Sequence, residues 1–112
     1  MMKDLREDYV RDLPQRVTSL KKWVEEGQVA LVRNEFHKFK GTGATYGLPE
    51  ISTLGETMER ICAELPPEQA LPLTLQGAAI LEEIYALRQQ GLGLNLDEHI
   101  GYKELKESLA HE

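Results

Sequence analysis

The chain has 112 residues, 41% of them hydrophobic, and a formal net charge of −6 at pH 7. That length predicts one domain with a single modest core. Plentiful Leu, Ala and Glu with only two Phe favour an all-α protein. The negative charge argues against nucleic-acid binding, which requires a basic surface. No hydrophobic run approaches the roughly 18 residues of a membrane-spanning helix, so no membrane partner is expected.

The cysteine content and the start of the chain predict a cytoplasmic protein. Cys62 is the only cysteine, which excludes an internal disulfide and suits a reducing compartment. Residues 1–8 carry too many charges for a signal peptide. Cys62 flanks a predicted apolar helix stripe, so we expect a buried thiol rather than a reactive one.

The first two predicted helices meet near Asp12. Asp4 and Glu7 form a capping-box variant that opens a short helix, and Pro14 then interrupts the pattern. The second helix closes at Gly27, which suits the left-handed conformation beyond a helix end. Trp23 lies at the edge of its apolar stripe, where a partly buried packing role is expected. The stripe consists of Leu13, Val17, Leu20 and Val24.

A third helix is predicted from about Gln28 to Tyr46, antiparallel to the second because the connection is very short. Gly47 ends it. Its apolar residues recur at steps of three and four, as Val29, Val32, Phe36, Phe39, Gly43 and Tyr46.

Two further helices follow. Pro49 suits the first position of a helix that stops before Pro66, and its apolar stripe is Ile51, Leu54, Met58, Ile61 and Leu65. Pro72 predicts that the last long helix begins at residues 71–73, and Gly91 caps its end.

The predicted architecture is therefore an antiparallel up-down four-helix bundle with a short N-terminal helix, over residues 1–91. Residues 92–112 form a C-terminal extension, in which Asp97 could cap a short helix that reaches about Leu109. The extension could pack along the bundle, pair with a second copy or bind a partner, and the sequence leaves these alternatives open. A monomer is favoured.

His37 is the candidate functional residue. At about 100° per residue, it lies well off the apolar stripe and faces solvent. Glycine within a helix costs roughly 1 kcal/mol relative to alanine, so Gly41 and Gly43 suggest that the surface beside His37 is kept low. Its other helical neighbours are Arg33, Asn34, Lys40 and Ala44.

His37, Lys40, Gly41 and Gly47 match the pattern H-x-x-K-G-x-x-x-x-x-G. In this pattern, and in residues 47–51 that follow, the chain resembles the histidine phosphotransfer (HPt) domains of two-component signalling, over about residues 3–90. The resemblance implies a relay of phosphoryl groups between receiver-domain aspartates through His37. It implies receiver domains and a histidine or hybrid kinase as partners. The receiver would supply the Mg²⁺, and the chain would be a carrier with no cofactor and no catalytic site of its own.

The residues around His37 suit this chemistry. A neutral imidazole has a nitrogen lone pair that can attack an acyl phosphate. Lys40, one turn away, can offset the charge of the phosphoryl group, and Lys38 can add charge at longer range. Gly41 and Ala44 leave the approach open, and Arg33 and Asn34 complete the expected docking surface.

Other sites find little support in the sequence. No His, Cys or carboxylate recurs at metal-ligand spacing beside His37, and no Ser is placed for a nucleophilic triad. His99 and His111 are expected to be either structural hydrogen-bonding residues or incidental surface residues. Two rival functions stay open. The chain could be the phosphorylation module of a chemotaxis-type kinase, charged directly by an ATP-binding domain, or an unphosphorylated helical scaffold.

Overall fold

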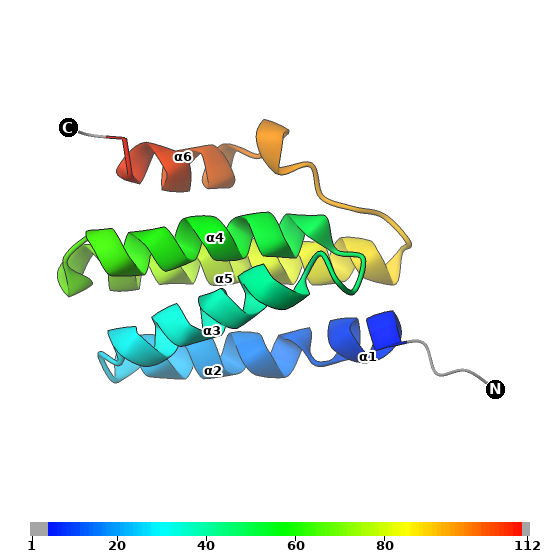
Figure 1. The fold of residues 1–112 in the computed structure, drawn as a ribbon, viewed down its shortest axis with the longest axis horizontal. Coiled ribbons are helices and arrows are strands. Elements are labelled where there is room, and N and C mark those ends of the chain that lie inside the picture. Colours follow the sequence, from blue (N-terminus) through cyan, green and yellow to red (C-terminus); the bar gives the residue numbers. More distant parts are fainter. Residues whose placement is uncertain (1–4, 111–112) are drawn as a thin grey trace.

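A computed structural model describes residues 5–110 of the chain. These residues form helices and turns with no strand among them, which confirms the predicted all-α class (Figure 1). The elements are α1 (Leu5–Arg11), α2 (Leu13–Glu25), α3 (Val29–Thr42), α4 (Pro49–Glu64), α5 (Pro67–Gln89), the 3₁₀ helix η1 (Leu96–Glu98) and α6 (Ile100–Ser108). Within this range, none of the helices combines the length and the hydrophobicity that a bilayer crossing requires.

The four longest helices pack around one core. Figure 1 shows the chain reversing direction after each of α2, α3 and α4. α3 packs along α4, α2 packs along α5, and α4 also contacts α5. Within α2, α3 and α4, the predicted stripe positions are buried, apart from Val24 and Val29, which are partly exposed. α3 and α4 also bury residues outside the stripes, namely Glu35, Glu50, Gly55 and Thr57. Trp23 is partly buried against the core, as predicted.

Glycines close two of the long helices. Gly27 and Gly91 have φ of 69° and 75°, the left-handed conformation that glycine adopts without a steric penalty. The amide after each glycine reaches back to a carbonyl of the last helical turn: Gln28 donates to Trp23 at 2.8 Å, and Leu92 donates to Leu87 at 2.9 Å. Both predicted helix ends are confirmed.

The end of α3 differs from the prediction. The helix stops at Thr42 instead of Tyr46, and residues 43–47 form a turn that Gly47 completes with φ of 84°. The amide of Leu48 donates to the carbonyl of Gly43 at 2.8 Å. This turn lets Pro49 begin α4 as predicted, directly against the end of α3. Gly43 is buried and Tyr46 is partly buried within this turn, so their apolar spacing does not mark a continued helix.

The start of α5 also differs. The helix begins at Pro67, and Pro72 lies inside it. Pro67 takes the first helical position, where its missing N–H costs nothing. Pro72 removes one hydrogen bond within the second turn, while the hydroxyl of buried Thr74 donates to the carbonyl of Ala70 across it at 2.9 Å. The prediction that Pro72 begins the helix was wrong because Pro67 provides an earlier start.

The C-terminal extension packs along α4 and α5. Leu105 is fully buried, and the hydroxyl groups of Tyr102 and buried Thr57 are hydrogen-bonded at 2.8 Å. Asp97 does not cap α6. His99 does so, because its Nδ1 accepts the amide N–H of Tyr102 at 3.1 Å. The predicted capping role of Asp4 falls outside the described residues.

Two shielded ion pairs tie the long helices together. Arg16 of α2 binds Glu35 of α3, and its guanidinium lies 3.8 Å from the centre of the Phe39 ring. Arg88 of α5 binds both carboxylate oxygens of Glu50 on α4, each at 2.8 Å. Breaking such a pair leaves an uncompensated charge, which costs about 3–5 kcal/mol at fully buried sites. The pairs fix how the helices that carry the site are placed.

Candidate functional site

The site is built where α3 and α4 approach most closely. A Cβ added to Gly55 of α4 would lie 2.6 Å from the backbone nitrogen of Lys40 and 2.8 Å from the carbonyl oxygen of Phe36. A Cβ added to Gly43 would lie 2.6 Å from the backbone nitrogen of Ser52. Both distances are shorter than any real contact, so the two glycines bring the backbones together. Gly43 therefore serves packing, and the expectation that it keeps the surface beside His37 low was wrong.

His37 points outward from α3, as predicted, with 65% of its side chain exposed. Its Nδ1 lies 2.7 Å from Oε2 of Glu59 on α4. The other oxygen of the same carboxylate, Oε1, lies 3.8 Å from Nζ of Lys40. One carboxylate from α4 thus contacts both members of the H-x-x-K pair on α3.

The contact with Glu59 determines which nitrogen of His37 is available. An ionised carboxylate can only accept hydrogen bonds, so Nδ1 must carry the proton that it donates to Glu59. In the neutral ring, Nε2 then holds the free lone pair. The carboxylate also restricts rotation of the ring and can stabilise positive charge that develops on it. The exposed His37 ring therefore offers Nε2 as a nucleophile, while the contact between Nδ1 and Glu59 fixes the orientation of the ring.

Lys40 and Gly41 lie where the sequence places them, one turn from His37. Lys40 is about half exposed, with a side-chain exposure of 45%. A Cβ added to Gly41 would meet nothing within 4 Å, so no packing contact requires glycine there. The open space predicted beside the imidazole is present.

Of the remaining predicted site residues, three lie on α3 with His37 and one lies in the turn after it. Arg33 and Asn34 are exposed and line an open groove of about 330 Å³ together with His37. Lys38 is exposed on the same helix. Ala44 is exposed as well, but it lies in the turn after α3 and not on the helical face of His37.

Glu59 is the functional residue that the sequence analysis missed. Nothing in the α3 sequence indicates a carboxylate beside His37, since the charged neighbours within that helix are Arg33 and Lys40. A signal exists on α4, where Gly55 interrupts a good helical pattern and marks a close backbone contact. Glu59 lies one turn after Gly55 and therefore faces the same neighbour.

The other reactive side chains have structural surroundings. Cys62 is partly buried, and this burial raises the pKa of its thiol to about 11. His99 contacts a carboxylate oxygen of Glu83 through Nε2 while its Nδ1 caps α6, in agreement with a structural role. His111 lies outside the described residues. Over residues 5–110, no three His, Cys, Asp or Glu side chains gather as a metal site would require.

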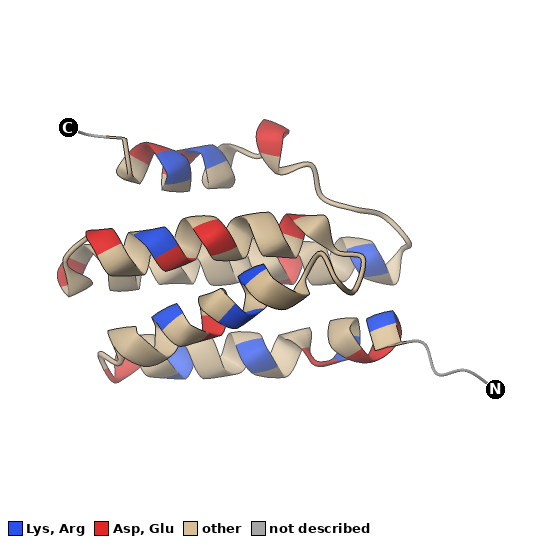
Figure 2. Cartoon of the chain, in the orientation of Figure 1, with Lys and Arg blue, Asp and Glu red and all other residues tan. Residues whose placement is uncertain are grey.

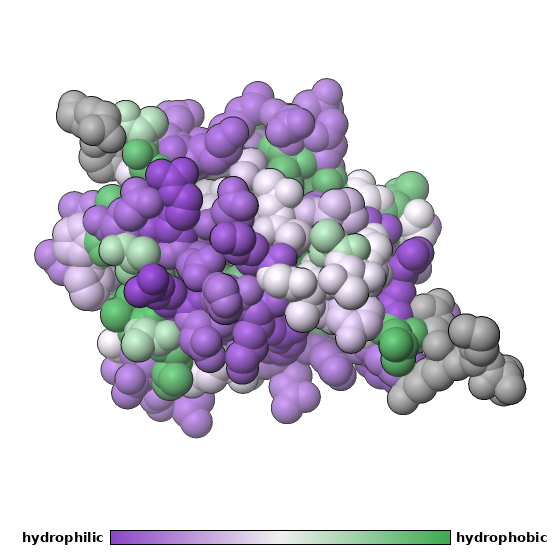
Figure 3. All heavy atoms as spheres, viewed as in Figure 1, coloured by the Kyte–Doolittle hydropathy of each residue, from purple (hydrophilic) through white to green (hydrophobic). Residues whose placement is uncertain are grey.

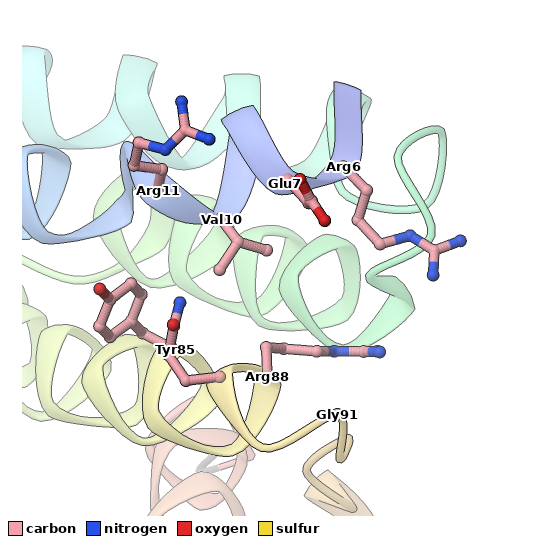
Figure 4. A pocket seen from close by; sticks show the side chains of 8 residues that line it. Arg6, Glu7, Val10, Arg11, Tyr85, Arg88 and Gly91 are labelled. Carbon is pink, nitrogen blue, oxygen red and sulfur yellow. The ribbon is translucent and has the colours of Figure 1, made fainter. Parts of the chain in front are cut away.

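A second hollow, of about 470 Å³, lies between α1 and the end of α5 (Figure 4). Several arginines line it, but Arg88 is bound to Glu50 and Arg11 to Asp8, and Arg6 donates to the carbonyl of Tyr46. Figure 4 shows the guanidinium of Arg11 pointing away from those of Arg6 and Arg88. His37 does not line this hollow, and each of its three arginines already has a hydrogen-bond or ion-pair partner within the chain.

A comparison with known protein families points to the same kind of protein as the exposed histidine on a helical scaffold does. Residues 4–90 match the family model described as Hpt domain. The chain therefore belongs to the Hpt family, whose members are histidine phosphotransfer modules of phosphorelay signalling. The match ends before η1 and α6. Comparisons with curated proteins and with solved structures gave no significant match.

Proposed function

We propose that the chain relays phosphoryl groups between aspartates of receiver domains, with Nε2 of His37 as the carrier atom. The observation that carries the proposal is the 2.7 Å contact between Nδ1 of His37 and Glu59 on an exposed, otherwise open helix face. It leaves Nε2 as the only ring nitrogen with a free lone pair. We include in the proposal that α2 to α5 act as the antiparallel four-helix bundle of this family and that the protein works in the cytoplasm.

The forward step forms one bond and breaks one. The lone pair of Nε2 attacks the phosphorus of an aspartyl phosphate, the P–O bond to the acyl oxygen breaks, and the receiver regains its carboxylate. The ring carries positive charge while Nδ1 stays protonated, and Glu59 stabilises that charge. Lys40 offsets the charge of the phosphoryl oxygens. Attack by the aspartate of a second receiver reverses these bond changes and restores neutral His37.

The partner completes the transfer site. In-line phosphoryl transfer depends on positioning and on charge neutralisation, commonly by Mg²⁺. The expected receiver brings the aspartate and the metal, and the chain contributes the nucleophile and a shaped surface. The chain is then a phosphotransfer intermediate rather than an enzyme.

Labelling from two donors tests this function. The protein is incubated with radiolabelled phospho-receivers of the source organism, and separately with ATP and a histidine-kinase ATP-binding domain. We expect label to move from a receiver to the parent protein and not to His37→Gln. Labelling only by the kinase domain would favour a kinase phosphorylation module. No labelling in either reaction would favour the unphosphorylated scaffold.

A further inference from the structure

The groove beside His37 is lined by both apolar and polar residues. Val29, Ala30 and Cys62 are its apolar lining, and Arg33, Asn34, His37 and Glu59 are its polar lining. In Figure 3 hydrophobic atoms are visible where the start of α3 comes near the end of α4, within a mostly hydrophilic face. With about 330 Å³, the groove is large enough for an aliphatic or aromatic side chain.

The exposed charges of α3 are all positive. Arg33, Lys38 and Lys40 are exposed, whereas the one acidic residue of the helix, Glu35, is buried and paired with Arg16. Figure 2 shows Lys and Arg along α3, whereas the other long helices carry residues of both charges. The whole protein has a formal net charge of −6. A basic strip on an acidic protein favours a partner with acidic side chains at the contact.

Arg33 is placed to make such a contact. Over the described part of the chain, no carboxylate forms an ion pair with Arg33 or Lys38, while Lys40 shares Glu59 with His37. Arg33 lies at the edge of the groove one turn before His37. It can therefore pair with a partner's carboxylate without breaking a contact within this chain.

We propose that the groove receives an apolar side chain of the receiver domain and that Arg33 pairs with an acidic residue next to it. The inference rests on the proposed function. His37 itself lines the groove, so a domain whose phosphoaspartate reaches Nε2 also covers the groove. Docking then extends toward the start of α3 and the end of α4, and not only over the open surface at Gly41.

Two variants separate the shape of the groove from its charge. Ala30→Gln fills the groove without a charge, and Ala86→Gln makes the same change on α5, away from the groove. Arg33→Glu reverses the charge beside the groove, and Lys103→Glu makes the same change on α6, which packs against α4 and α5. All four positions are exposed, and circular dichroism checks that each variant keeps the parent helicity. The probe is the receiver domain that labels the parent fastest.

We expect Ala30→Gln to slow phosphoryl transfer about tenfold at every salt concentration, because a steric block is not screened. Arg33→Glu should slow transfer about tenfold at low ionic strength and much less near 0.5 M salt, roughly where the Debye length falls below 5 Å. Both controls should stay within about twofold of the parent. In the ¹⁵N spectrum of the parent, the receiver should shift the amides of Val29, Ala30 and Cys62.

The failures are distinguishable. A parent that no receiver labels at His37 would overturn the proposed function and this inference together. If the parent is labelled but Ala30→Gln transfers at the parent rate, or the groove amides do not shift, only the groove inference is overturned. Equal slowing by Arg33→Glu and Lys103→Glu would assign the effect to net charge and contradict a contact at Arg33.

Discussion

Replacing Gly55 with alanine tests whether the close approach of α3 and α4 depends on the missing side chain. The added Cβ would lie 2.6 Å from the backbone nitrogen of Lys40 and 2.8 Å from the carbonyl oxygen of Phe36. Backbone atoms cannot rotate away as a side chain can, so the two helices must separate. Glu59 lies one turn further along α4, and it would move away from His37.

Two opposing terms determine the expected change in stability. Alanine improves helix propensity by roughly 1 kcal/mol. Overpacking a tight contact costs about 1–3 kcal/mol, and contact with backbone places Gly55→Ala near the upper end of that range. The net destabilisation is then about 1–2 kcal/mol. Gly41→Ala is the matched control, because its Cβ meets nothing within 4 Å and it should gain up to about 1 kcal/mol.

Urea unfolding followed by circular dichroism measures both variants under identical conditions. We expect Gly41→Ala to be more stable than Gly55→Ala by about 1–3 kcal/mol. The Gly55 variant should also transfer phosphate more slowly, since Glu59 no longer fixes the ring. A Gly55→Ala protein at least as stable as the parent would refute the argument that this glycine sets the helix spacing.

Three further predictions concern the surroundings of His37. Lys40→Ala should slow transfer about fivefold, the equivalent of about 1 kcal/mol for a half-exposed charge, and unchanged kinetics at unchanged helicity would reduce Lys40 to a solvated lysine. Gly41→Gln should melt no lower than the parent yet exchange phosphate far more slowly, and normal transfer by that variant would show that the partner docks elsewhere. Burial raises the pKa of the Cys62 thiol from 9.0 to about 11. The free energy of unfolding should therefore fall as the pH rises from about 9 to 11, where the unfolded chain loses the thiol proton before the folded protein does. At pH 8 the native thiol should react with a disulfide reagent about a hundredfold more slowly than in urea, and equal rates would contradict its burial.

The sequence was sufficient for features that depend on local periodicity. The steps between Val32, Phe36 and Phe39 predict the buried side of α3, and His37 then falls outside it. Gly27 and Gly91 close helices where a left-handed residue is needed. These features require only the helical repeat and the backbone preferences of single residues.

Features that depend on how two helices are set against each other could not be predicted in this way. Glu59 reaches His37 only because Gly55 allows α4 to approach α3 at a particular offset, and periodicity contains no information on that offset. The same limit applies to the extension, where His99 and not Asp97 caps α6. The residue that His99 caps, Tyr102, is itself hydrogen-bonded to Thr57 on α4, a contact between distant segments.

The nitrogen that carries the phosphoryl group tests the central claim most directly. The parent protein is charged by a phosphorylated receiver, and its ³¹P spectrum is compared with those of the two phosphohistidine isomers and with His37→Gln treated in the same way. Because Glu59 occupies Nδ1, we predict one phosphohistidine signal, at Nε2, that is labile to acid, stable to base and absent from His37→Gln. A signal from Nδ1, or an equal signal from the His37→Gln protein, would contradict the account.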